Sequence, residues 1–253
     1  MTFATLLEPG ANQGIGIAFT DRWGGVSDPP YDSFNLGRDG QDDPAHLRKN
    51  FAILAAAIRC DKLAICAQVH GTQVAPVDSG FACVTALGTW PDKARLPQAD
   101  ALMTTVPGVA LMMRVADCVP VLLADPGVRV VAAVHAGRVG LVAGVIPAAV
   151  HALRSAGARE IRAWIGPHIC AACYEVPEAM ATRAWELVPD SQAVSRTGTP
   201  AINLGGGAAA QLAAEGVETR RVDPCTACDG RFFSHRRDQG STGRQAGVIW
   251  LEK

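Results

Sequence analysis

The stretch LMMRVADCVPVLLADPGVRVVAAVHAGRVG, residues 111–140, contains two valine-rich apolar runs separated by Asp125-Pro126-Gly127. Continuous apolar runs of this kind are typical of strands that are buried on both faces of a sheet. Proline presets φ and glycine tolerates a positive φ, so the two residues after Asp125 suit the centre of a tight turn. The stretch therefore predicts a buried β-hairpin.

The register of this hairpin decides which side chains meet at its open end. If the two turn residues alone form the loop, Asp125 pairs with Val128. Continuing that register places Cys118 opposite His135, with Cβ atoms about 4.5–5.5 Å apart. One extra loop residue would put the thiol and the imidazole on opposite faces of the sheet. A buried structural cysteine beside an ordinary loop histidine is the alternative interpretation.

Composition narrows the class of protein. The chain has 253 residues, 49% of them hydrophobic, which is enough for a large core. Strand and helix patterns follow one another without a repeat or linker, so we predict one catalytic domain over residues 1–253. Its predicted fold is an α/β layered sandwich with a mixed β-sheet core flanked by helices.

Hydropathy and net charge argue against a membrane or nucleic acid as a partner. The longest apolar runs are shorter than the roughly 18 residues of a membrane span, and a net charge of −1 gives no electrostatic footprint for nucleic acid. No basic segment followed by an apolar one opens the chain, so no secretory signal is predicted. Eight cysteines are too few for a disulfide scaffold of this length. We expect a cytoplasmic monomer or small homo-oligomer that acts on small molecules.

Three further segments predict elements around the hairpin. Asp43-Pro44 offers a helix N-cap followed by proline in the first turn. A strand from Leu63 to Val69 places His70 at its end, and Gln73–Val77 is expected to resume that strand. Leu141–Ala156 is an alanine-rich helix pattern closed by a glycine.

Cys118, His135 and His70 together would give Zn²⁺ three protein ligands. Zinc is usually four-coordinate, so the fourth position would hold water or substrate, as in catalytic sites. The same residues permit a metal-free interpretation with Cys118 as nucleophile and His135 as its base. Copper is the less favoured metal, because a type 1 site usually adds an axial methionine and a multicopper oxidase needs more than the six histidines present.

Two CxxC pairs form a competing metal motif, Cys170-Ala-Ala-Cys173 and Cys225-Thr-Ala-Cys228. The usual Cys₄ zinc ribbon separates its pairs by about 15–20 residues, whereas the gap here is about 50. Reduced structural cysteines are therefore the favoured interpretation, ahead of a zinc site or a redox pair.

Three arginines near the C-terminus form either a phosphate site or a solvated basic tail, and the tail is slightly favoured: Arg236, Arg237 and Arg244.

Taken together, these segments resemble one family from about Phe19 to Leu251. The matching stretches are RWGGVSDPPYDSFNLG, QVHGTQV, ADALMTTVPG, ADCVPVLLAD, VAAVHAGRVG, IGPHI…CYEV and CT…FFSHRRD…TGRQ. They are similar to the laccase-domain, or polyphenol oxidase, family, also called YfiH-like. Its members are described as purine nucleoside phosphorylases with adenosine deaminase side activity, and some as peptidoglycan editing factors.

The resemblance implies a zinc-dependent phosphorylase acting on adenosine and inosine, and extending to methylthioadenosine, with phosphate as co-substrate. It implies that the catalytic zinc ligands are His70, Cys118 and His135. It further implies that substrate contacts come from Asn35, Gln68 and Arg244. The alternatives are a hydrolase that removes a misincorporated amino acid from a peptidoglycan precursor, a copper-binding polyphenol oxidase, and a non-catalytic metal-binding or regulatory protein.

Two departures from the family pattern each remove a cation expected near substrate. The usual His-Ala-Gly-Trp-Arg-Gly has Arg138-Val139 in place of Trp-Arg, and the usual Asn-Arg of the first helix is Asn50-Phe51. Arg48, on a neighbouring helical position, is the candidate replacement and the fourth predicted substrate contact. The CxxC pairs fall where relatives carry variable residues, which weakens the Cys₄ interpretation.

Overall fold

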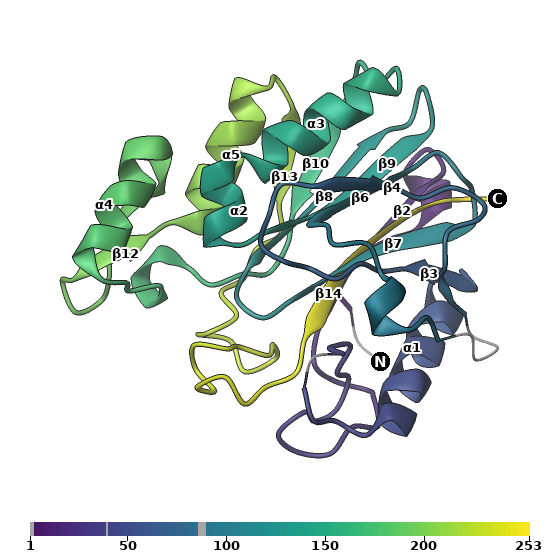
Figure 1. Cartoon of the computed structure of the whole chain (residues 1–253), viewed down its shortest axis with the longest axis horizontal. Coiled ribbons are helices and arrows are strands. Elements are labelled where there is room, and N and C mark those ends of the chain that lie inside the picture. The colour runs from purple at the N-terminus through teal and green to yellow at the C-terminus, as the bar shows by residue number, and fades with distance from the viewer. Residues whose placement is uncertain (1–2, 39, 86–89) are drawn as a thin grey trace.

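Two mixed six-stranded sheets form the centre of the structure, a computed structural model that describes residues 3–38, 40–85 and 90–253 (Figure 1). The first sheet has the strand order β1 (Phe3–Leu7), β2 (Ile15–Thr20), β14 (Gln245–Leu251), β7 (Val109–Val115), β3 (Lys62–Ala64), β5 (Val84–Thr85). The second has the order β13 (Glu218–Arg221), β10 (Arg162–Ile165), β8 (Val119–Asp125), β9 (Val130–Ala136), β6 (Ala101–Thr104), β4 (Val74–Pro76). The strands of the 111–140 stretch are therefore interior strands.

Helices flank both sheets. In the described ranges they are α1 (Pro44–Ala57), α2 (Arg138–Ala143), α3 (Val145–Ser155), α4 (Glu178–Leu187) and α5 (Leu204–Ala214), with a small sheet of β11 (Gln192–Val194) and β12 (Pro200–Ile202). In Figure 1, α3 and α5 lie on one side of the sheets and α1 on the other. The Asp43 side chain accepts a hydrogen bond from the Ala45 N–H and Pro44 fills the first turn, which confirms the predicted start of α1.

Three hydrophobic clusters separate the layers. The cluster between the sheets contains Leu111 of β7 and Leu122 of β8. A residue adjacent to each of these points the other way: Val121 packs with residues of α3 and α5, and Met112 packs with Leu54 of α1. Because both faces of β7 and β8 are covered, their sequences are apolar at every position but one or two.

The predicted α/β class and layered sandwich are confirmed, with one correction. The prediction had a single mixed sheet, and the structure has two that pack face to face. The chain passes from the first sheet to the second between β7 and β8, across residues 116–118. Nothing in two consecutive apolar runs distinguishes strands of one sheet from strands of two, so the sequence did not reveal this crossing.

The predicted hairpin is present, but its predicted register is wrong by two residues. Asp125 pairs with Val130, so the loop has the four residues 126–129, and His135 lies opposite Pro120 rather than opposite Cys118. Side chains alternate between the faces of a sheet with a period of two. A shift of two residues therefore keeps the thiol and the imidazole on the same face, where a shift of one would have separated them.

The longer loop is held by the Asp125 carboxylate. It accepts hydrogen bonds from the Gly127 N–H at 2.8 Å, and from the N–H groups of Arg159 and Glu160 at 2.6 and 2.8 Å. Arg129 completes the loop with a left-handed φ of 52°. The contacts to the α3–β10 connection lie more than 30 positions away in the chain, so the turn sequence alone could not predict them.

The strand predicted to run through His70 is two strands in different sheets. β3 ends at Ala64 in the first sheet, and β4 begins at Val74 in the second. His70 lies on the connection between them and has a left-handed φ of 60°. The histidine is therefore on a crossing between the two sheets, and not at the end of one continuous strand.

The helix predicted over Leu141–Ala156 is also interrupted. α2 begins three residues earlier, at Arg138, and a break at Gly144 separates it from α3. Gly144 has a φ of 88°, and Gly157 just beyond α3 has a φ of 98°. Glycine adopts this left-handed conformation without a Cβ penalty, so one glycine divides the helix and the other ends it.

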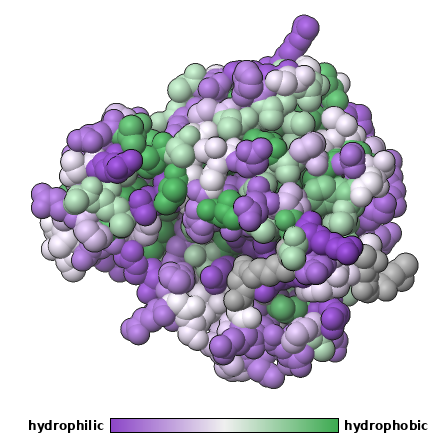
Figure 2. Space-filling view, viewed as in Figure 1, coloured by the Kyte–Doolittle hydropathy of each residue, from purple (hydrophilic) through white to green (hydrophobic). Residues whose placement is uncertain are grey.

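Much of the molecular surface seen in Figure 2 is hydrophilic. Figure 2 shows hydrophilic residues around small, separate hydrophobic groups. Within residues 3–38, 40–85 and 90–253, no helix combines the length and the apolar character that crossing a membrane requires.

Candidate metal centre

His70, Cys118 and His135 converge on one point. Their donor atoms all lie within 4.8 Å of one another, and the Cys118 Sγ is 3.8 Å from the His70 Nε2. Tetrahedral zinc, with bonds of about 2.0–2.3 Å, holds such donors about 3.3–3.8 Å apart. The three predicted ligands therefore fit a single zinc ion, with one coordination position left open.

Asp100 orients His135. The His135 ring is 3% exposed and its Nδ1 lies 2.7 Å from the Asp100 Oδ1. The carboxylate thereby fixes the tautomer and turns the Nε2 toward the thiol, as carboxylates behind metal-binding histidines do. The sequence analysis missed Asp100, because one acidic residue just before a strand has no pattern that marks it.

The same carboxylate also shapes the loop that carries His70. Asp100 accepts hydrogen bonds from the N–H groups of Val69, His70 and Gly71 at 3.1, 3.0 and 2.6 Å. Three bonds to consecutive N–H groups hold the loop in a conformation that includes the left-handed φ of His70. One fully buried side chain therefore positions two of the three ligands.

Gly137 allows the three ligands to approach. A Cβ on Gly137 would lie 2.6 Å from the His70 Cδ2 and 3.0 Å from the Cys118 Sγ. Those distances are shorter than van der Waals contact, so a larger residue would push the ligands apart. The glycine that follows His135-Ala136 is thus required by the site itself.

The electrostatics of the centre favour the metal-binding form of the thiol. Burial raises the pKa of Cys118, but the charges and hydrogen bonds of His135 and His70 outweigh it and lower that pKa to about 6. Burial in turn lowers the pKa of His135, and Cys118 and Asp100 outweigh it and raise that pKa to about 9. The pair therefore favours a Cys118 thiolate, the form that binds zinc, beside a protonated His135, whose proton a bound ion would displace.

The centre opens into a cavity of about 360 Å³, within the range of small-molecule sites. Its walls combine apolar groups with cations. The apolar wall is formed by Ile169, Tyr174 and Leu204, and the polar wall includes Arg114, His235, Arg236 and Arg244. The cavity can therefore hold a ligand that has one apolar, planar part and one anionic part.

Three of the four predicted substrate contacts lie in or behind this cavity. Gln68 and Arg244 line it. The Gln68 amide also bonds the backbone and guanidinium of Arg114. Asn35 is not among the lining residues; its Oδ1 accepts hydrogen bonds from the Gly37 and Arg244 N–H groups. Asn35 thus positions two lining residues from behind.

Arg48 lies elsewhere. It is exposed on α1, with its guanidinium 5.9 Å from the centre of the Trp90 ring, and is not among the residues that line the cavity. Phe51, at the other departure from the family pattern, is buried and packs edge-on against Trp90. Burial raises the pKa of Tyr174 and the charge of Arg138 opposes that rise, so the shifted arginine lies near this residue of the cavity wall.

The arginines near the C-terminus are not a solvated tail. Arg237 donates to the backbone oxygens of Thr226 and Phe232 and pairs with Asp238. Arg236 and Arg244 line the cavity. The tail interpretation is therefore wrong, because this segment folds back over the site.

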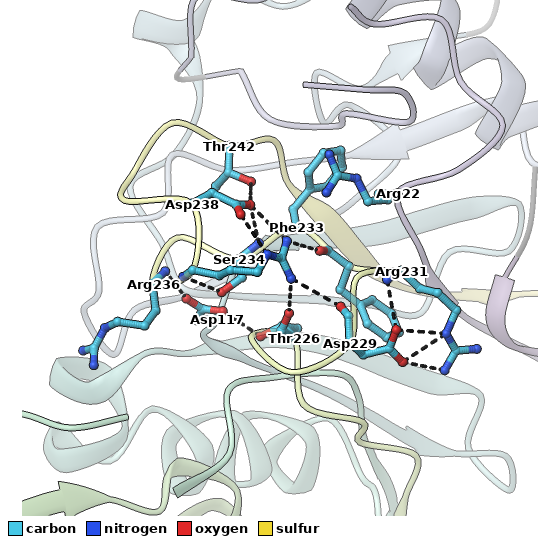
Figure 3. A network of polar contacts seen from close by, with 12 residues as sticks. Arg22, Asp117, Thr226, Asp229, Arg231, Phe233, Ser234, Arg236, Asp238 and Thr242 are labelled. Carbon is cyan, nitrogen blue, oxygen red and sulfur yellow. Dashed lines mark hydrogen bonds and ion pairs between the residues drawn. The ribbon is translucent and has the colours of Figure 1, made fainter. Parts of the chain in front are cut away.

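Asp117 fastens Cys118 to that C-terminal segment. Its carboxylate accepts hydrogen bonds from the Thr226 Oγ1 at 2.6 Å and from the Arg236 N–H at 2.7 Å (Figure 3). Asp117 is buried and has a left-handed φ of 90°. The residue before the metal-binding cysteine therefore sets the direction in which the thiol enters the cavity.

Comparison with known proteins identifies the family of the chain. The model of the family described as "Multi-copper polyphenol oxidoreductase laccase" matches residues 16–252. The chain belongs to this family. This confirms the resemblance drawn from the sequence motifs. The match covers the chain except for its first 15 residues and its last residue.

Two curated laccase-domain relatives carry the name purine nucleoside phosphorylase. The protein of Streptomyces griseus is 47% identical over 241 residues, covering 93% of this chain and 94% of the relative. That of Streptomyces coelicolor is 45% identical over 244 residues, with 94% and 96% covered. Among solved structures, the hypothetical protein YfiH of Bacillus licheniformis superposes with a TM-score of 0.87 at 28% identity, covering 98% and 97% of the two chains.

Proposed function

We propose that this chain is a zinc-dependent purine nucleoside phosphorylase acting on adenosine, inosine and methylthioadenosine, with adenosine deamination as a side activity. The observation that carries the proposal is the open set of His70, Cys118 and His135 on a cavity lined by arginines. The names of the Streptomyces relatives support the choice of substrate. We also propose that residues 1–253 form one catalytic domain that works in the cytoplasm.

The cavity offers a place for each part of a phosphorolysis reaction. The reaction breaks the bond between C1′ of the ribose and N9 of the purine, and forms a bond from C1′ to a phosphate oxygen. Arg236 and Arg244 offer the positive charge that holds phosphate against C1′. Backbone oxygens anchor one nitrogen of each guanidinium, for Arg244 those of Thr242 and Gly243, which fixes both cations at the wall.

The apolar residues that line the cavity suit the purine. Ile169 and Leu204 exclude water from its faces. Burial and the charge of Cys118 raise the pKa of Tyr174, so its phenol stays protonated and can donate a hydrogen bond to a ring nitrogen or a ribose hydroxyl. His70, Cys118 and His135 would hold the zinc ion, which would supply a Lewis acid to the cavity.

The donor set fits zinc better than the copper that the family description names. A type 1 copper site has two histidines, a cysteine and usually a weak axial methionine. Among the described residues that line the cavity there is no methionine. One thiolate, an open position and two imidazoles, of which His135 becomes neutral when the ion displaces its proton, form the donor set of a catalytic zinc site.

Product analysis tests the proposal. Protein loaded with zinc is incubated with adenosine or inosine, with and without phosphate, beside Cys118→Ala. We expect wild type to release the free base and ribose 1-phosphate only with phosphate, and to form inosine slowly from adenosine. Cys118→Ala should form none of these products at a comparable rate.

Two results would overturn the proposal. If wild type releases no hypoxanthine, adenine, inosine or ribose 1-phosphate, the purine assignment fails. If Cys118→Ala keeps full activity, the site assignment fails. Release of an amino acid from a peptidoglycan precursor, or oxidation of a phenol by copper-loaded protein, would favour the corresponding alternative.

A further inference from the structure

A second group of four cysteines lies outside the cavity. Cys170, Cys173, Cys225 and Cys228 are free thiols whose Sγ atoms all lie within 4.8 Å of one another. The Sγ atoms of Cys173 and Cys228 are 3.4 Å apart. The sequence favoured reduced structural cysteines over a zinc site here; the thiols are indeed free, and the structure gathers all four of them at one place.

The fold explains why a gap of about 50 residues still brings the two CxxC pairs together. β10 and β13 are adjacent parallel strands, with Ile165 paired to Arg221. Each CxxC pair begins four or five residues after the end of its strand, and the carboxyl ends of parallel strands lie at the same edge of a sheet. The intervening residues form the crossover that contains α4, β11, β12 and α5.

Local contacts place the two pairs face to face. The segments form a parallel bridge between His168 and Cys225. The Cys170 N–H donates a hydrogen bond to the Cys225 Sγ at 3.2 Å. On the other side, the Arg196 Nη2 donates to the Cys228 Sγ at 2.7 Å. A backbone amide and a guanidinium that donate to cysteine sulfur stabilise the thiolate form.

The spacing matches tetrahedral coordination. With Zn–S bonds of about 2.3 Å, four thiolates around one ion lie about 3.8 Å apart. The Cys173 and Cys228 Sγ atoms lie 3.4 Å apart, slightly less than this value, and every other pair of Sγ atoms lies within 4.8 Å. Sulfur atoms joined in a disulfide lie at about 2.05 Å, so the arrangement differs from two closed bridges.

We propose that Cys170, Cys173, Cys225 and Cys228 bind a structural zinc ion, a second metal site in addition to the candidate metal centre. Four thiolates fill every position of tetrahedral zinc, so this site is closed to substrate. The inference goes beyond the proposed function and does not depend on it.

The position of the second site gives it a role in shaping the cavity. Ile169 and Tyr174, which directly flank the first CxxC pair, both line the cavity. Thr226, inside the second pair, donates to Asp117 beside Cys118, and the Cys173 carbonyl accepts from Arg236. A zinc ion here would hold together the segments that form the apolar wall and the cationic wall.

X-ray absorption and metal analysis of Cys118→Ala, purified under reducing conditions without chelator, test the inference. This variant leaves all four cysteines of the second site intact. We expect one zinc per chain with four sulfur ligands, and two zinc ions per chain in wild type. Cys225→Ser with Cys228→Ser should retain only an ion with mixed nitrogen and sulfur ligands, while Cys83→Ala, a buried cysteine outside both groups, should keep two.

The outcomes separate this inference from the proposed function. A four-sulfur zinc in Cys118→Ala supports the second site whatever the nucleoside assay shows. Absence of a four-sulfur zinc from that variant overturns it, as does iron in its place or a disulfide between the two CxxC pairs in the reduced protein. If the double variant does not fold, the spectrum of Cys118→Ala still decides.

Discussion

The candidate metal centre and the proposed four-cysteine site are built in different ways. The candidate metal centre takes its ligands from β9 and from two crossings between the sheets, and the buried Asp100 supports it. The four-cysteine site takes its ligands from two short segments at the ends of adjacent parallel strands. The first leaves a coordination position open to a cavity and the second leaves none. The difference teaches that the open centre relies on one buried carboxylate to orient its histidines, whereas the four cysteines are brought together by the pairing of two adjacent strands.

His70→Ala should have the largest effect and the most selective one. Removing one of three ligands should release the zinc of the candidate metal centre and lower kcat/KM at least about 100-fold, because losing even a residue behind a ligand costs about 10–100-fold. Zinc analysis and nucleoside assays measure both effects. His151→Ala, at an exposed histidine of α3, is the control and should change neither. Loss of both zinc ions would contradict the independence of the two sites.

Gly137→Ala tests whether the spacing of the three ligands matters when their identity is unchanged. All three donors remain, but the new Cβ would lie 2.6 Å from the His70 ring and force it to move. Displacements of about 1 Å at a reacting centre cost up to about 100-fold in rate. Steady-state kinetics and zinc affinity by competition with a chelator measure the loss. Gly10→Ala, where a Cβ meets nothing within 4 Å, is the matched control. Unchanged kinetics in Gly137→Ala would show that the ligands do not need this approach.

Asp100→Asn should weaken the open site and spare the closed one. The amide keeps the shape of the carboxylate but loses its charge and part of its capacity to accept from the His70 loop. We expect zinc affinity of the candidate metal centre to fall about 10–100-fold, as measured by chelator competition. Asp61→Asn, at an exposed carboxylate, should be silent. Equal weakening of the four-sulfur ion would contradict the contrast drawn above.

Thr226→Val should have the smallest effect, on the connection between the two sites. It removes the hydroxyl that donates to the Asp117 Oδ1 and leaves a buried acceptor with one partner fewer. We expect the free energy of unfolding to drop by about 1–3 kcal/mol, with a few-fold loss of activity and both zinc ions retained. Denaturant unfolding measures the drop, and Thr226→Ser, which keeps the hydroxyl, should recover most of it.

Local sequence was sufficient for features that depend on local interactions. The cap at Asp43 and the apolar runs of β7, β8 and β9 were predictable, because a cap and a buried strand leave a pattern within a few residues. The three ligands of the candidate metal centre came from the hairpin and from the family motifs together. The structure gathers those three side chains.

Features that depend on distant contacts were not predictable. The hairpin loop has four residues because Asp125 also bonds the N–H groups of Arg159 and Glu160. The proximity of the two CxxC pairs could not be predicted from their separation of about 50 residues in the chain. A crossover returns the chain to the neighbouring strand and so brings the pairs together. Asp100 was missed because its partners, His70 and His135, lie 30 and 35 positions away.

His70 and Cys118 each lie where the chain crosses from the first sheet to the second. Each of these two residues is joined through the chain to both sheets, so a change in how the sheets pack acts on the segments that carry them and is expected to alter zinc affinity. By linkage, an ion that binds only the native spacing also stabilises that packing. A substitution such as Leu122→Ala, deep between the sheets, should weaken zinc binding without touching a ligand. Selection for metal binding in this chain therefore acts on its hydrophobic interior as well.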